Sequence, residues 1–133
     1  MKDFQTSLVP TLSVRNGVAA IEFYKKAFGA VEAMRIESPD GLVVAELSIS
    51  VARFFIADES PEYGNLSPET AKGVTTRMGL FVEDPDAVAD KAVKAGATLL
   101  YPVADQDYGY RLGAVKDPFG HVWEIARKLE EPA

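Results

Sequence analysis

Few side chains in this sequence could carry out chemistry, because its 133 residues include no cysteine and a single histidine, His121. The absence of cysteine excludes a disulfide scaffold, a thiolate zinc site, an iron–sulfur cluster and a cysteine nucleophile. A Ser-His-Asp triad is arithmetically possible, but the sequence contains no G-x-S-x-G nucleophile elbow. The chemistry open to the chain therefore depends on acidic side chains, arginines and aromatic groups.

The charge and hydropathy of the chain exclude several kinds of partner. Twenty acidic residues against fourteen basic ones give a formal net charge of −6, and no basic run is longer than Lys25-Lys26. Such a chain has no cationic stripe to displace counterions from a nucleic acid. The first residues lack the apolar run of a signal peptide, and no stretch approaches the roughly 20 apolar residues of a membrane span. We expect a cytoplasmic, soluble protein with no nucleic-acid or membrane partner.

An internal repeat organises the sequence. Residues 9–27 align with residues 77–95 at a constant offset of 68. The identical pairs are Leu12/Leu80, Val14/Val82, Ala19/Ala87, Lys26/Lys94 and Ala27/Ala95. Both copies also have the same boundary signals, so the alignment predicts two copies of one structural module.

Each copy predicts a short strand, a helix and three further strands. The helices are predicted to begin after the capping residues Asn16 and Asp84, and to end at Gly29 and Gly96. The strand-like runs that follow are residues 30–37, 42–50 and 52–58 in the first copy, and residues 97–104, 110–116 and 121–127 in the second. We predict one α+β domain over residues 1–133, with βαβββ modules at about 9–58 and 77–127 and a linker at 59–76 rich in Pro, Gly, Ser and Glu.

Specific motifs accompany this repeat. The first helix reads IEFYKKAFGA, and the turn Asp117-Pro118-Phe119-Gly120-His121 leads into a strand that contains Glu124. Together these features resemble the vicinal oxygen chelate superfamily, which includes glyoxalase I, bleomycin-resistance proteins, fosfomycin-resistance enzymes and extradiol dioxygenases. The resemblance extends from about Val9 to Ala126 and is closest to the small bacterial PhnB-like branch. It implies an open, cup-shaped mixed sheet with helices on the convex side, and a homodimer.

The resemblance also implies where a metal ion would bind. Metal-dependent members bind one divalent ion through four side chains, and those positions correspond here to Val9, about Ile56, Arg77 and Glu124. Only Glu124 is a metal ligand, and one carboxylate beside a guanidinium cannot hold a divalent cation tightly. We therefore expect no metal and no cofactor.

Strand alternation divides the side chains between the helix-packed face and the concave face, where members of the superfamily hold their ligands. In strand 42–50 the apolar residues alternate with polar ones, and the polar ones are assigned to the cup. The same reasoning applies to the first and last strands of the second copy. The side chains expected in the cup are Glu46, Ser48, Arg77, Phe81 and Glu124.

Three further residues surround Gly109 in a loop expected over the mouth of the cup, namely Tyr108, Tyr110 and Arg111. Aromatic side chains in such places stack on planar ligands, although they could equally seal the edge of the sheet. Glu46 has a comparable alternative as a solvated carboxylate on an open sheet face. His121 follows a glycine turn and is interpreted as a structural histidine rather than a catalytic base.

Arg77 and Glu124 occupy two of the metal positions, which lie side by side in the superfamily. We predict that they form a charge-assisted hydrogen bond there. The alternative is that Arg77 reaches outward to a carboxylate or phosphate of the ligand.

The function predicted from these residues is metal-independent binding of a small organic molecule in the cup, as in proteins of the bleomycin-resistance type. The alternative is a glyoxalase-like lyase or isomerase, or a related metal-dependent enzyme. A metal-free enzyme with Glu124 or Glu46 as general base, and a regulatory module without a small ligand, also remain open. The sequence therefore leaves open whether the protein is an enzyme.

Overall fold

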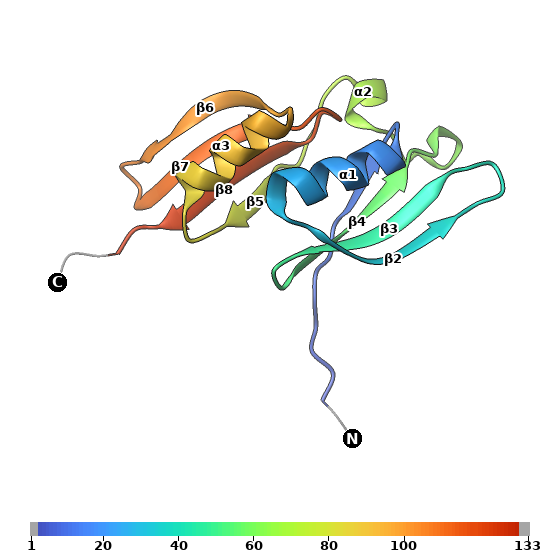
Figure 1. Ribbon diagram of the computed structural model, residues 1–133, viewed down its shortest axis with the longest axis horizontal. Coiled ribbons are helices and arrows are strands. Elements are labelled where there is room, and N and C mark those ends of the chain that lie inside the picture. Colours follow the sequence, from blue (N-terminus) through green and yellow to red (C-terminus); the bar gives the residue numbers. More distant parts are fainter. Residues whose placement is uncertain (1–2, 131–133) are drawn as a thin grey trace.

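The computed structural model describes residues 3–130 and contains the predicted pair of βαβββ modules (Figure 1). The first module consists of β1 (Thr11–Val14), α1 (Gly17–Phe28), β2 (Val31–Glu37), β3 (Val43–Ile49) and β4 (Ala52–Asp58). The second consists of β5 (Met78–Phe81), α3 (Pro85–Ala95), β6 (Thr98–Asp105), β7 (Tyr110–Lys116) and β8 (Val122–Lys128). The α+β fold class predicted from the sequence is confirmed.

The two four-stranded sheets have the same topology. Their strand orders are β1-β4-β3-β2 and β5-β8-β7-β6, and in each the first pair is parallel while the others are antiparallel. The register repeats as well, because Thr11 lies opposite Phe55 in one sheet and Gly79 lies opposite Glu124 in the other. The offset of 68 residues found in the sequence therefore relates structurally equivalent positions.

Both long helices begin and end at the predicted residues. The side chains of Asn16 and Asp84 each accept a hydrogen bond, at 3.1 Å, from the backbone N–H three residues further on. At the other ends Gly29 and Gly96 adopt φ values of +67° and +128°, which a residue without Cβ adopts at little cost. These signals are local, which explains why the sequence located both helices.

Helix α1 packs against both sheets and joins the modules. Its Tyr24 ring lies 5.5 Å from the Phe54 ring of β4 and 5.5 Å from the Trp123 ring of β8. Phe28, at the end of the helix, lies 4.7 Å from Trp123. Each such side chain contributes about 1.5–3 kcal/mol through burial. Because α1 and α3 lie on the same side of the sheets (Figure 1), no helix within residues 3–130 covers the opposite faces.

The turn between β7 and β8 fastens the second module to the first. Asp117 is only 3% exposed. It accepts hydrogen bonds from the Tyr24 hydroxyl, the Trp123 indole N–H at 2.9 Å, and the backbone N–H groups of Phe119 and His121 at 2.9 and 3.0 Å. The imidazole Nε2 of His121 lies 2.9 Å from the carbonyl oxygen of Ser13 in β1. These contacts support the structural interpretation of His121.

The segment between the modules is more ordered than its composition indicated. It contains a short 3-10 helix, η1 (Pro61–Tyr63), and a four-residue helix, α2 (Pro68–Ala71). Glu59 accepts hydrogen bonds from the Ser67 N–H at 2.8 Å and the Thr70 hydroxyl at 2.9 Å. These bonds fold the segment onto itself, and a hydrogen bond of 3.3 Å from the Arg15 Nε to the Thr70 hydroxyl connects it to the first module. None of the helices within residues 3–130 is long and apolar enough to cross a membrane.

Candidate functional site

The open face of the second sheet presents a floor of small residues. The register aligns Tyr101, Ala114, Glu124 and Gly79 in one row across β6, β7, β8 and β5, and it places Ala126 beside Phe81 in the next row. Residues opposite one another on neighbouring strands share a face. Ala114 and Ala126 are buried, yet they are not part of the core that packs beneath the helices. Their burial comes from side chains on the open face.

Arg77 and Glu124 lie together at one end of this floor as an ion pair, without the predicted hydrogen bond. The Arg77 Nε lies 3.2 Å from the Glu124 Oε1, and the Tyr101 hydroxyl donates a hydrogen bond of 3.0 Å to the Oε2. Both oxygens of the carboxylate are therefore engaged. Burial, followed by the hydrogen bond to Glu124, raises the pKa of Tyr101 above its ordinary value, so the hydroxyl keeps its proton and remains a donor.

The guanidinium of Arg77 is directed toward solvent. Its side chain is 67% exposed, whereas that of Glu124 is 24% exposed. Among residues 3–130, no hydrogen bond from either terminal nitrogen of Arg77 is formed. The group is thus held at Nε, while its two terminal amino groups remain available to an acceptor outside the chain.

Aromatic rings lie along the other end of the floor. The Phe81 ring is 5.9 Å from the Tyr110 ring, and Tyr110 is 6.2 Å from Tyr108. Phe81 and Tyr108 are each 61% exposed, although large aromatic side chains are usually buried. A Cβ added to Gly79 would lie 3.6 Å from the Phe81 ring, so this ring leans over the glycine. Exposed rings beside a small-residue floor offer stacking surfaces to a planar molecule.

Arg111 does not join these tyrosines, contrary to the expectation from the sequence. Its guanidinium binds both oxygens of Asp86 in α3, at 2.8 Å each, and Asp105 at 2.9 Å. The physical reason is alternation. Strand β7 already begins at Tyr110, so Tyr110 and Arg111 project to opposite faces. The sequence interpretation treated these residues as one loop cluster and missed this division.

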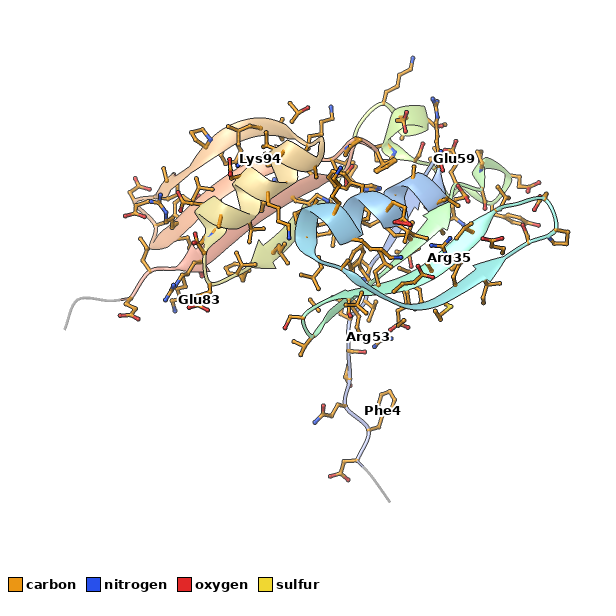
Figure 2. All side chains as sticks on the ribbon, in the orientation of Figure 1. Phe4, Arg35, Arg53, Glu59, Glu83 and Lys94 are labelled. Carbon is orange, nitrogen blue, oxygen red and sulfur yellow. The ribbon has the colours of Figure 1, made fainter. Side chains whose placement is uncertain are left out.

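Glu46 and Ser48 lie on the other sheet, in the first module. Glu46 accepts a hydrogen bond of 2.9 Å from the Nε of Arg53, and the side chains are 22% and 44% exposed. Arg53, labelled in Figure 2, lies directly opposite Ser48 in β4. The predicted residues thus form two groups on two sheets, Glu46 and Ser48 in one and Arg77, Phe81, Tyr108, Tyr110 and Glu124 in the other.

Sequence reasoning missed Tyr101 and Arg53. The β6–β7 register shifts on both sides of Tyr101, so simple alternation along residues 97–104 gives no reliable face for it. Arg53 could have been found, because Glu46 and Arg53 flank a hairpin and opposite charges at diagonal cross-strand positions attract.

Two hollows in the part of the chain that the structure describes lie away from this face. One of about 530 Å³ is lined by Pro68, Lys72, Leu100, Lys116 and Pro118, among others. A second of about 400 Å³ lies between the segment at 66–76 and the starts of β1 and β5, with His121 in its wall. The open face is a surface rather than an enclosed cavity. It therefore needs a covering group before it can enclose a ligand.

The paired modules and the open face opposite the helices define a protein of the glyoxalase type of α+β fold. Residues 8–125 match the family described as Glyoxalase/Bleomycin resistance protein/Dioxygenase superfamily, and the chain belongs to this superfamily. It is 37% identical over 131 residues to the uncharacterized protein Rv0887c of Mycobacterium tuberculosis, covering 96% of this chain and 77% of that protein.

Two solved structures have a similar fold. TioX from Micromonospora sp. ML1 superposes with a TM-score of 0.70 at 22% identity, covering 96% of this chain and 100% of that chain. A glyoxalase-related enzyme from Fulvimarina pelagi superposes with a TM-score of 0.73 at 22% identity, covering 93% of this chain and 89% of that chain. At this level of identity the likeness concerns the fold.

The side chains at the family's metal positions do not fit a divalent ion. The register corrects one of these positions, because the equivalent of Glu124 in the first module is Phe55 on the open face, not Ile56, which is fully buried in the core. Val9, Phe55 and Arg77 offer no lone pair to a cation. Nor do any three His, Asp or Glu side chains within residues 3–130 gather as metal ligands would.

Proposed function

We propose that this protein binds a small organic molecule on the open face of its sheets without using a metal ion, as proteins of the bleomycin-resistance type do. The supporting observation is the Arg77–Glu124 pair. A guanidinium, which stays protonated, stands at one of the superfamily's metal positions and binds the only metal-ligating side chain at those positions. The same pair that excludes a cation supplies a polar anchor for a ligand.

The surroundings of the pair support this proposal. Gly79 is exposed in the interior of β5, and glycine in a strand interior is often found where a ligand approaches the backbone. Exposed aromatic rings border it at Phe81 and Tyr108. Apolar walls with a few convergent polar groups are the usual composition of a small-molecule site.

A homodimer is part of the same proposal. Each open face needs a cover, and a second copy would supply one. Apolar side chains remain exposed on these faces, including Val31, Ile36 and Val44 in the first module. The segment before β1 also projects from the body of the protein with Phe4 and Leu8 almost fully exposed (Figures 1 and 2). We also assign the chain to the PhnB-like branch, because of its first helix and its C-terminal motifs.

Two measurements on the same purified sample test the proposal. Elemental analysis should find well under one zinc, nickel or iron per chain, and ligand-observed NMR against a library of small aromatic and polar compounds should detect binders in the presence of EDTA. Stoichiometric metal, or binding that EDTA abolishes, would contradict metal independence. A hemithioacetal isomerisation assay with added zinc or nickel tests the alternative enzyme function, and turnover above background would favour that function instead.

A further inference from the structure

We infer that the ligand of the second module's open face is a flat aromatic molecule with a carboxylate or an equivalent anionic group. This inference depends on the proposed function, because it names the class of molecule that the same face binds. It follows from the contacts of Arg77 with Glu124 and from the aromatic rings that lie farther along the same face.

Arg77 is prepared to bind an anion. The Glu124 carboxylate engages its Nε at 3.2 Å and is itself fixed through its second oxygen by Tyr101 at 3.0 Å. This arrangement orients the guanidinium and leaves its terminal N–H groups directed at solvent. Guanidinium groups bind carboxylates through parallel hydrogen bonds of this kind.

A cationic ligand finds no equivalent partner here. The Tyr101 hydroxyl donates a hydrogen bond to one oxygen of Glu124, and the ion pair with Arg77 engages the other oxygen and compensates its charge. The face is therefore selective for anions at this position, although the whole chain has a formal net charge of −6. Long-range repulsion from that charge is weakened by salt, whereas a direct ion contact is much less affected.

The floor beside Arg77 fits an aromatic ring. Arg77 and Phe81 are four residues apart, about 13 Å along an extended strand, so a flat molecule that contacts the edge of the Phe81 ring would extend past Gly79 toward the Arg77 guanidinium. No side chain projects from Gly79, which is exposed, whereas the neighbouring Ala114 and Ala126 are almost fully buried. Phe81 and Tyr110, which meet at an interplanar angle of 73°, provide an edge and a face for stacking.

The inference is tested with three probes that share one ring system and differ in charge: 2-naphthoate, 2-naphthamide and 2-naphthylmethylammonium. Dissociation constants are measured by ligand-observed NMR titration at constant salt and in EDTA. The intact protein should bind the naphthoate at least about tenfold more tightly than the amide, since hydrogen bonds to charged groups are the stronger ones. The ammonium probe should bind most weakly.

Three variants test whether the preference for the anionic probe comes from Arg77 and whether the probes bind beside Gly79. Arg77→Met should make the naphthoate and the amide bind equally weakly, and Gly79→Leu should abolish binding of both by filling the floor. Arg127→Met is the matched control, because Arg127 lies on the same sheet opposite Arg111 and so projects from the other face. It should leave all three dissociation constants unchanged. Thermal unfolding of each variant verifies that it is folded.

The outcomes separate the two proposals. If the three probes bind equally, or Arg77→Met leaves the preference for naphthoate intact while Gly79→Leu abolishes binding, the face binds ligands but the anionic class is wrong. If the library screen detects binders and Gly79→Leu changes none of their affinities, the proposed function of this face is itself overturned.

Discussion

The Arg77–Glu124 ion pair should contribute little to the stability of the fold, because the Arg77 side chain is largely exposed to solvent. With 67% of the Arg77 side chain exposed, the pair falls in the class of exposed ion pairs, whose coupling energies are about 0.2–1 kcal/mol. A buried pair broken from one side would instead cost about 3–5 kcal/mol. The exposure therefore decides between these two magnitudes in favour of the smaller one.

A double-mutant cycle measures this coupling. Urea unfolding of the intact protein, Arg77→Met, Glu124→Gln and the double variant should give a coupling free energy below about 1 kcal/mol. Arg77→Met alone should lower the melting temperature by less than about 4 °C. A coupling above about 2 kcal/mol would refute this reasoning and make Arg77 a structural residue.

The buried hydrogen bond between Tyr24 and Asp117 provides an internal reference for that cycle. Asp117 is 3% exposed and accepts the Tyr24 hydroxyl hydrogen bond. Tyr24→Phe leaves the carboxylate with one donor fewer and should cost about 1.5–3 kcal/mol in the same urea experiment. Burial, followed by the charge of Asp117, raises the pKa of Tyr24, so this hydroxyl stays protonated throughout the accessible pH range. Equal losses of unfolding free energy from Tyr24→Phe and Arg77→Met would contradict the expectation that the buried hydrogen bond matters more than the exposed ion pair.

Three other predictions concern the rest of the fold. Hydrogen bonds from Arg35 and then Lys25 lower the pKa of Glu32 to about 2, so these contacts stabilise the protein above about pH 4.5 and are lost as the pH falls toward 2. Glu32→Gln should therefore weaken the decrease of the unfolding free energy between about pH 4.5 and 2, and an unchanged decrease would contradict this prediction. Gly113→Ala should destabilise by about 1–3 kcal/mol, because a Cβ there would lie 2.6 Å from the backbone nitrogen of Val103; a normal melting curve would show that β6 can move. Sedimentation velocity at micromolar concentration should detect a homodimer, and a monomer would argue against the proposed covering of the open faces.

The fold was predictable because its signals are local and occur twice. Asn16 and Asp84 cap the helices, and the offset of 68 residues relates Thr11 to Gly79 in matching parallel pairs. The same regularity gave the Arg77–Glu124 contact, since Arg77 directly precedes β5 and Glu124 belongs to β8, and the register of these two strands is unbroken. Helix α2 has only four residues within a segment rich in Pro, Gly and Ser, and so it has no periodicity to detect.

The candidate site was harder to predict where strand register matters. Tyr101 lies between two register shifts, so its face cannot be counted from the sequence. Arg111 was grouped with Tyr108 and Tyr110 around Gly109, because alternation was not applied to the first two residues of the strand predicted at 110–116. The choice between Ile56 and Phe55 likewise depended on a single residue of register, which moves a side chain from the core to the open face.

We expect the open face around Arg77, rather than the hollow near His121, to bind the ligand without metal. Backbone ¹H–¹⁵N chemical shifts of the EDTA-treated protein, recorded with and without 2-naphthoate, test this claim most directly. We expect the largest shifts at Gly79, Phe81, Ala114, Glu124 and Ala126. Shifts confined to Leu66, Val74, Thr75 and His121, which line the hollow, would contradict it.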